Sequence, residues 1–219
     1  MKNKSTFTVF ILAITLLMAC SNEPKSTQKT AVRDSTKIKD SLNKSEDIKK
    51  EENKVLGNIV FGVSEAQFDQ DLSQFKSTLE HNEFQSVFVI GDYIVTDIKG
   101  SFDNHKLYKF ITYGDFIPYQ RYKEELLPQV EILKAMIAES YGPPQSGTGA
   151  PAEDSIEKDY SYLAYSWIIG TKKIEIRITN RDLYYSADLK IYQPQVEELI
   201  KKREADKKTR TIEKAEDVL

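Results

Sequence analysis

Two histidines and a pair of aspartates are the side chains in this sequence that most resemble metal ligands. His81 and His105 lie 24 residues apart, so they lack the close spacing with which one element presents two zinc ligands. Asp69 and Asp71 match the first two ligand positions of a calcium loop, but Gln74 stands where that loop needs glycine. The sequence therefore predicts no metal site and no cofactor.

Acidic side chains beside predicted turns are the remaining candidates for proton transfer. A hydrolytic domain would use two of them as general acid and base. Acids in turns more often cap backbone groups in solvent, and no other catalytic motif accompanies them. We therefore predict that the protein is not an enzyme, and we keep a glycan-binding or hydrolytic envelope domain as the alternative. The four candidate acids are Asp92, Asp97, Asp103 and Asp115.

One cysteine follows an apolar N-terminal segment. Lys2 and Lys4 precede the apolar run Phe7–Ala19, which at 13 residues is shorter than the about 20 residues that span a bilayer. The run ends in Leu17-Met18-Ala19-Cys20, and the chain has no second cysteine with which Cys20 could form a disulfide. This arrangement resembles the signal peptide and lipobox of bacterial lipoproteins.

The lipoprotein resemblance implies a removable leader and a lipid anchor. Residues 1–19 would be cleaved, and Cys20 would carry acyl chains, palmitate among them, that hold the mature protein on the membrane. Ser21 stands where retention in the inner membrane calls for aspartate, so the outer membrane is the expected location. Loss of two lysines with the leader changes the formal charge from -3 to -5, and we expect no nucleic-acid partner.

Composition divides the rest of the chain into three parts. Residues 20–56 contain mostly lysine, serine, threonine and acids, and we predict a disordered tether that holds the domain about 30 to 36 Å from the lipid. The helical spacing of Ile38 and Leu42 leaves a transient helix open within it. Residues 57–193 are predicted to form one α+β domain, and residues 194–219 a charged, solvated helical tail.

Two stretches with helical periodicity are separated by runs that are typical of strands. The first helix is predicted over Glu65–Leu79, with Ser64 and Gln67 as a capping box. The second ends at Tyr141, before a Gly-Pro-Pro run, and Pro128 is compatible with it only in the first turn. Strands are predicted at residues 86–98, with a break at 91–92, and at 106–113, 162–169, 172–179 and 184–192.

Residues 172–179 show how the strands meet the helices. Isoleucine alternates there with charged residues, which predicts a sheet with one dry face, covered by both helices, and one wet face. The order helix, strands, helix, strands predicts an antiparallel α+β domain with a tandem helix–strand repeat of about 60 residues. The inward-facing residues of the strand are Ile174, Ile176 and Ile178.

Aromatic residues are more numerous in the predicted strands than one buried face requires. Neighbouring residues in a strand point to opposite faces, so aromatics next to inward-facing aliphatic residues would stand on the wet face. Exposed aromatics on a sheet bind proteins or glycans. The alternative is that residues 145–158 or the terminal helix cover them. The candidate binding residues are Tyr93, Tyr108, Phe110, Tyr184 and Tyr192.

Four short motifs lie at the ends of predicted elements. They are Phe61-Gly62-Val63-Ser64, Ile90-Gly91-Asp92-Tyr93, Asn104-His105-Lys106-Leu107-Tyr108 and Tyr141-Gly142-Pro143. Together they resemble motifs of the SmpA/OmlA (BamE-like) and beta-lactamase-inhibitor-protein-like envelope lipoproteins. The resemblance implies small α+β repeats that bind proteins, including outer-membrane assembly partners, and that have no active site.

This chain departs from that family pattern in its long tether, its charged tail and the single helix of its first repeat. The expectation is a non-enzymatic, lipid-anchored envelope protein whose domain binds another envelope protein, in outer-membrane assembly or maintenance.

Overall fold

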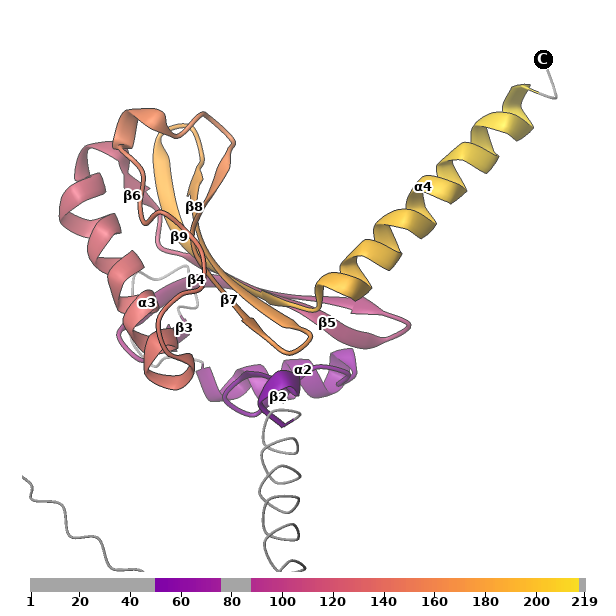
Figure 1. The fold of residues 1–219 in the computed structure, drawn as a ribbon, viewed down its shortest axis with the longest axis horizontal. Coiled ribbons are helices and arrows are strands. Elements are labelled where there is room, and N and C mark those ends of the chain that lie inside the picture. The colour runs from indigo at the N-terminus through magenta and orange to yellow at the C-terminus, as the bar shows by residue number, and fades with distance from the viewer. Residues whose placement is uncertain (1–49, 76–87, 217–219) are drawn as a thin grey trace, which may run out of the picture. The chain divides into compact units, whose positions relative to one another are not determined.

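A computed structural model of the 219-residue chain describes residues 50–75 and 88–216. The predictions for the leader, for Cys20, for most of the tether and for His81 fall outside these residues. Within them, an antiparallel sheet carries helices on one face, as Figure 1 shows. The predicted α+β class is therefore confirmed.

Seven strands form the main sheet, and the pairings between them are antiparallel. The predicted strands are present, with the expected break between the first two. The short strand β6 (Ile117–Pro118) pairs with the beginning of β9. The order of the other six along the sheet is β3 (Phe88–Ile90), β4 (Tyr93–Asp103), β5 (Lys106–Gly114), β9 (Tyr184–Tyr192), β8 (Lys172–Asn180) and β7 (Ser161–Ile169).

The sheet is made of two halves with the same order of elements. Helix α2 (Glu65–Leu72) precedes the three strands β3, β4 and β5, and helix α3 (Leu127–Tyr141) precedes β7, β8 and β9. The last strands of the two halves, β5 and β9, pair at the centre of the sheet, where Lys109 lies opposite Tyr192. The predicted tandem repeat is thus present as a repeat of element order.

Both helices pack on the same face of the sheet. Helix α2 places the ring of Phe68 5.6 Å from that of Phe102 and 6.2 Å from that of Phe110. Helix α3 contributes Val130 and Leu133, which are fully buried. The core is continuous across the two halves, and it includes the predicted inward-facing row of β8, namely Ile174, Ile176 and Ile178.

Local hydrogen bonds set the ends of α2. Ser64 Oγ accepts a hydrogen bond from Gln67 N at 3.3 Å, so the predicted N-cap is present. The Gln67 side chain instead donates to Asp71 Oδ1 at 2.8 Å, so the other half of the capping box does not form. The α-helix ends at Leu72, earlier than predicted, and continues as a single 3-10 turn to Phe75; the end of the predicted helix, residues 76–79, lies outside the described residues. In α3, Pro128 lies in the first turn as expected.

The last residues of the predicted tether belong to the fold, so the prediction of disorder is wrong for residues 50–56. Residues 50–53 are helical, and β1 (Lys54–Leu56) pairs with β2 (Ile59–Val60). Val55 is 4% exposed and joins the main core. The domain therefore begins before the predicted boundary at residue 57.

A buried lysine explains why this segment is held in place. Lys172 is fully buried, and its Nζ donates to the backbone oxygens of Glu51 and Lys54, at 2.5 and 2.8 Å, and to Tyr141 Oη at 3.1 Å. Burial lowers the pKa of Lys172 to about 8. Because a buried amine without partners is costly, the carbonyl oxygens of residues 51 and 54 are required by the core.

A loop covers the outer edge of β7. The Gln145 side chain accepts from Ile168 N at 2.8 Å and donates to Ile168 O at 3.2 Å, as a neighbouring strand would. Gly149 N donates to Ala164 O at 3.1 Å. At Gly147 a Cβ atom would lie 2.1 Å from that same oxygen, so only glycine permits the close approach. This loop protects the sheet edge from further pairing.

Helix α4 (Pro194–Glu216) follows β9 directly and extends away from the sheet, as Figure 1 shows. Its first turn is closed by Gln193 O, which accepts from Val196 N and Glu197 N, both at 3.1 Å. From residue 201 to residue 211 every side chain is exposed. The predicted charged C-terminal helix is therefore present.

Candidate functional site

Four of the five predicted binding aromatics are buried, so the prediction of an exposed aromatic face built from them is wrong. Tyr93 and Phe110 are fully buried, Tyr192 is 7% exposed and Tyr108 is 8% exposed. Only Tyr184, at 43% exposed, is accessible. These residues do not form one surface.

The physical reason differs between the strands. In β5 the aliphatic residues Leu107 and Ile111 suggest one inward-facing row, but a β-bulge after Leu107 shifts the phase, so that Phe110 and Thr112 face inward in place of Ile111. Tyr93 is anchored in the core, where its hydroxyl donates to Ala187 O at 2.5 Å. Tyr192 does lie opposite the core, but the amine of Lys190 is 3.8 Å from its ring centroid and covers it.

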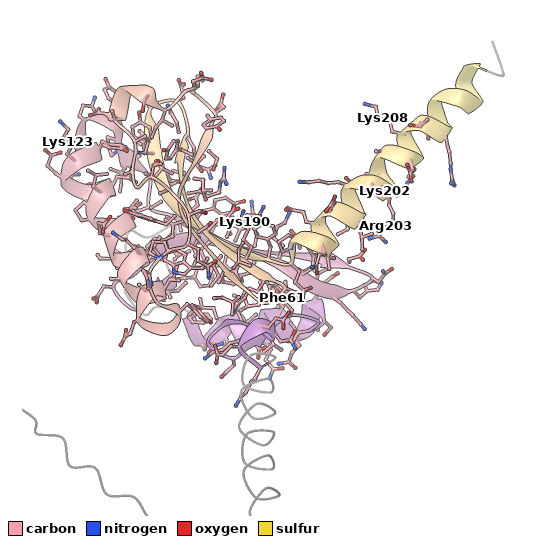
Figure 2. The ribbon with its side chains drawn as sticks, in the orientation of Figure 1. Phe61, Lys123, Lys190, Lys202, Arg203 and Lys208 are labelled. Atoms are coloured by element: carbon pink, nitrogen blue, oxygen red, sulfur yellow. The ribbon has the colours of Figure 1, made fainter. Side chains whose placement is uncertain are left out.

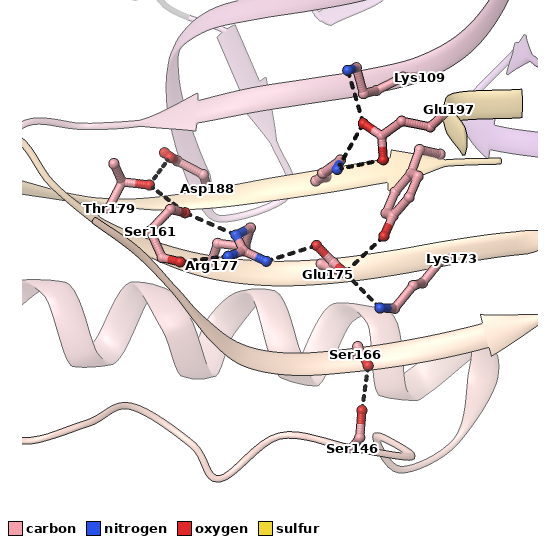
Figure 3. Close-up of polar contacts among 12 residues, drawn as sticks. Lys109, Ser146, Ser161, Ser166, Lys173, Glu175, Arg177, Thr179, Asp188 and Glu197 are labelled. Atoms are coloured by element: carbon pink, nitrogen blue, oxygen red, sulfur yellow. Dashed lines mark hydrogen bonds and ion pairs between the residues drawn. The ribbon is translucent and has the colours of Figure 1, made fainter. Parts of the chain in front are cut away.

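The wet face of the sheet carries a connected set of charged side chains, shown in Figure 3. They come from β5, β8, β9 and the first turn of α4, and cross-strand register places them side by side. We call this surface the polar face. Its residues are Lys109, Lys173, Glu175, Arg177, Asp188, Lys190, Tyr192 and Glu197.

Glu175 is the centre of the polar face. Its carboxylate lies 2.8 Å from Lys173 Nζ and 3.0 Å from Arg177 Nη1, and it accepts from Tyr192 Oη at 3.0 Å. Burial alone would raise the pKa of Glu175, but the hydrogen bonds from Lys173 and Tyr192 and the two nearby cations outweigh it and lower that pKa. The carboxylate is therefore charged and fully engaged.

Glu197 fixes the first turn of α4 to the sheet. Its carboxylate lies 3.1 Å from Lys109 Nζ and 3.2 Å from Lys190 Nζ. Burial opposes ionisation, yet the hydrogen bond from Lys109 and the charge of Lys190 lower the pKa of Glu197. Farther along the helix, Arg203 Nη2 lies 2.6 Å from Asp103 Oδ1 at the end of β4. These ion pairs set the direction in which α4 leaves the domain.

Asp188 closes the network at its other end. Its carboxylate accepts from Thr179 Oγ1 at 2.7 Å and from Gly114 N at 3.3 Å. Burial raises the pKa of Asp188 in spite of these donors and of the nearby Arg181. Charged groups on the polar face are thus paired with one another rather than presented to a ligand.

The four acids considered for proton transfer do not come together. Asp92 and Asp103 lie at opposite ends of β4. Asp97 pairs with Lys99 at 3.3 Å, and Asp115 Oδ1 accepts from the next backbone N–H at 2.8 Å. The geometry therefore assigns these acids to turns and surface ion pairs.

Several chain segments that meet where β9 begins carry exposed hydrophobic side chains. Of the eight large hydrophobic residues that are exposed in the described part of the chain, five lie here, each 43 to 58% exposed. The rings of Phe116 and Tyr184 are 6.5 Å apart, and Tyr119 N donates to Leu183 O at 3.3 Å. Tyr160 O accepts from Asn180 N, at the end of β8. We call Phe116, Tyr119, Tyr160, Leu183 and Tyr184 the tip.

Arg181 lies between the tip and the polar face. Its guanidinium carbon is 5.1 Å from the ring centroid of Tyr113 and 5.7 Å from that of Phe116. Its Nη2 is 3.7 Å from Asp188 Oδ2, and its Nε donates to Ser186 Oγ at 3.4 Å. Cation–π contacts with these two rings hold the cation at the border of the apolar surface.

A cavity of about 540 Å³ lies beside the tip and shares Tyr119 with it. The hydroxyls of Tyr122 and Tyr185 donate to the backbone oxygens of Pro151 and Glu153, at 2.8 and 3.0 Å. Burial raises the pKa of Tyr122 to about 12, so this hydroxyl stays protonated. The cavity wall is lined by a single acid, Glu153, where a hydrolase of the kind considered needs two.

Residues 50–75 and 88–216 contain no group of three or more His, Cys, Asp or Glu side chains that could hold a metal ion. Among the same residues no helix is long and apolar enough to cross a membrane.

Comparison with known proteins gives no relative. No family model, no curated protein and no solved structure matches the chain. The resemblance to envelope lipoproteins therefore stays a prediction from the sequence motifs.

Sequence reasoning missed most of the tip. Leu183 gave the clearest signal, because a large aliphatic residue between Asp182 and Tyr184 is unusual in a polar hairpin turn. Phe116 and Tyr160 follow acids in predicted connections, where no strand periodicity assigns a face. Their convergence depends on the β6–β9 pairing, which no local pattern encodes.

Proposed function

We propose that the protein is a non-enzymatic lipoprotein of the bacterial cell envelope, anchored by acylated Cys20, whose α+β domain binds protein chains through the tip. The observation that carries the proposal is that five exposed hydrophobic side chains lie on segments at one end of the sheet. The lipobox of Leu17-Met18-Ala19-Cys20 supports the anchor, and Ser21 after the cysteine supports the outer membrane as its location.

The area of the tip fits a binding surface. A large aromatic side chain has about 150 to 250 Å² of surface, so five side chains that are about half exposed present on the order of 500 Å². Apolar patches of roughly 300 to 600 Å² are the largest on a typical monomer and are often functional. Tyrosine and arginine, which dominate binding hot spots, are both present in or beside it.

The polar face is a weaker candidate because its charges are already paired. A ligand would have to replace the partners of Glu175, and breaking a buried ion pair costs about 3 to 5 kcal/mol. Binding at the tip requires no ion pair to be broken, since covering its side chains only removes apolar surface from water.

The resemblance to BamE-like lipoproteins gives the proposal its setting. Members of that group act by binding proteins, including partners in outer-membrane assembly. A protein-binding tip on a tethered α+β domain is compatible with such a function. We propose assembly or maintenance of the outer membrane as the process.

Photo-crosslinking in intact cells tests the binding surface. A photoreactive phenylalanine analogue replaces Tyr184 in the tip or, as the matched control, Leu199, which is 61% exposed on α4. We expect discrete protein adducts from position 184 and none of them from position 199. Adducts that are the same at both positions, or absent at 184, would contradict the proposal.

Metabolic labelling tests the anchor separately. A palmitate analogue should label the wild-type chain, and the label should be lost in Cys20→Ala, which also accumulates with its leader uncleaved. Equal labelling of the variant would remove Cys20 as the lipid attachment point.

A further inference from the structure

We infer that a second copy of this chain is the occupant of the tip, related to the first by a two-fold axis. The inference rests on the proposed function, because it names the partner of the same surface. It is carried by the charges around the tip, by the area of the tip and by the tethering of every copy to one membrane.

The charges beside the tip are self-complementary. Lys158 and Arg181 contribute two cations, and Asp159 and Asp182 contribute two anions within the same short segments. Lys158 Nζ and Asp182 Oδ1 are 3.0 Å apart, and both side chains are 62% exposed. Charges of both signs at one place are met by opposite charges when an identical surface is rotated onto them.

The Lys158–Asp182 ion pair can exchange partners between two copies at a small cost in free energy. Because Lys158 and Asp182 are open to solvent, each can swap its partner within the chain for the same residue of the second copy. No charge is left buried and unpaired in the assembled pair. A partner with one dominant sign of charge would leave two like charges facing each other on the tip.

The apolar area fits a dimer of modest affinity. Two tips of on the order of 500 Å² together bury about 1,000 Å², which is the lower limit for a specific interface. Aromatic side chains such as Phe116 and Tyr184, whose rings meet edge to face, leave ring surface available to the second copy.

Tethering raises the strength of such a contact. Copies anchored by Cys20 to one membrane share a thin layer, so their effective concentration is far higher than in free solution. A contact that is weak for free domains is therefore populated on the membrane.

Two differently tagged full-length copies, expressed in the same cells, identify the occupant. The photoreactive analogue replaces Tyr184 in one copy, and the adducts formed on irradiation are probed for the tag of the other copy. We expect the main adduct to carry both tags. The same analogue at Leu199 on α4 is the control and should give no doubly tagged adduct.

The outcomes separate the two proposals. A doubly tagged adduct that is specific to position 184 supports both. Adducts at 184 that contain only other proteins overturn the second-copy inference and leave protein binding at the tip intact. Absence of any adduct at 184 overturns both.

Matched substitutions show whether the adduct depends on the tip. Leu183→Asp should lower the yield of the doubly tagged adduct at least about tenfold, whereas Leu199→Asp, an equal change at an equally exposed leucine, should leave it unchanged. Equal yields in both variants would overturn the inference. Protease resistance of each variant in the same cells verifies that the domain is folded.

Charge reversal tests the two-fold arrangement. Two copies with Lys158→Glu, or two copies with Asp182→Lys, place like charges across the axis and should crosslink less than wild type. A Lys158→Glu copy with an Asp182→Lys copy restores opposite charges and should crosslink more than either identical pair. Equal yields in all combinations would overturn the two-fold arrangement.

Discussion

The polar face and the tip are two surfaces of one sheet with opposite relations to solvent. On the polar face, charged side chains such as Glu175 and Asp188 are buried and paired with their neighbours. At the tip, side chains that belong in a core, such as Leu183 and Phe116, are exposed. The charged groups of the polar face are paired within the molecule, whereas the apolar side chains of the tip remain exposed to solvent.

This difference shows which surface is prepared for a partner. A dense group of charged residues in a sequence suggests a binding site. In the folded domain these residues form ion pairs and hydrogen bonds with one another, so they stabilise the structure. Exposed aliphatic and aromatic groups have no such internal solution, because only another molecule can remove them from water. Substitutions in the two regions should therefore affect different properties.

The largest effect is expected for Glu175→Ala on the polar face. The substitution leaves Lys173, Arg177 and the Tyr192 hydroxyl without their shared acceptor, so we expect the free energy of unfolding to fall by about 3 kcal/mol. Urea denaturation measures the change. In the control Asp97→Ala, which breaks a solvent-exposed pair with Lys99, the loss should be within about 0.5 kcal/mol.

Lowering the pH should also reduce the free energy of unfolding, through protonation of Glu175 on the polar face. The folded pKa of Glu175 lies below its ordinary value of about 4.3, so the unfolded chain takes up the proton first as pH falls. Stability from this group is complete above that ordinary value and is lost as pH drops through the lowered folded pKa. Urea denaturation between neutral pH and pH 3 should show a shallower loss in Glu175→Gln than in wild type. Parallel curves would contradict the assignment.

Substitution in the tip should alter association and spare stability. Leu183→Asp changes a side chain that is 58% exposed, so we expect the free energy of unfolding to stay within about 0.5 kcal/mol of wild type. Crosslinking through position 184 should nevertheless fall sharply. A large loss of stability in this variant would show that Leu183 belongs to the core and that the comparison fails.

A small effect, mainly on the direction of a helix, is expected at the foot of α4. Glu197→Gln removes the charge that Lys109 and Lys190 share, at a site near the surface, so domain stability should fall by less than about 1 kcal/mol. The direction of the helix should become less defined, because among the described residues the Arg203–Asp103 pair is then the remaining ion pair between the helix and the sheet.

Distances between spin labels measure that direction. Labels at Lys123, on the turn before α3, and at Lys208, on the exposed part of α4, report the angle of the helix; Figure 2 labels both positions. We expect a broader distance distribution in Glu197→Gln than in wild type. The neighbouring variant Glu198→Gln, an exposed glutamate on the same turn, is the control and should leave the distribution unchanged.

Periodic patterns predicted the fold well because they are local. The alternating isoleucines of β8 and the glycine after Tyr141 each determine a face or an end without help from distant residues. Long-range contacts were less accessible. The order of residues 50–56 depends on Lys172, more than a hundred residues away, and nothing in their composition indicates that a buried amine needs their carbonyl groups.

The candidate site was harder to predict for a related reason. Tyr93, Phe110 and Tyr184 have similar chemistry, and only the phase of each strand decides which of them is exposed. In β5 the aliphatic residues Leu107 and Ile111 both suggest the inward face, and Leu107 does face the core, but a β-bulge after it shifts the phase so that Phe110 and not Ile111 faces inward. Exposure of Tyr184 was predicted correctly, whereas its neighbours in the tip come from segments that no periodicity describes.

Hydroxyl-radical footprinting of the full-length chain in native envelopes tests the central claim most directly. Oxidation of the tip residues Tyr119, Tyr160 and Tyr184 is compared with oxidation of Leu199 on α4, and envelope protein is compared with the same chain diluted in detergent. We predict that the three tyrosines are protected in the envelope while Leu199 reacts equally in both. Equal oxidation of the tip in the two preparations would contradict the account.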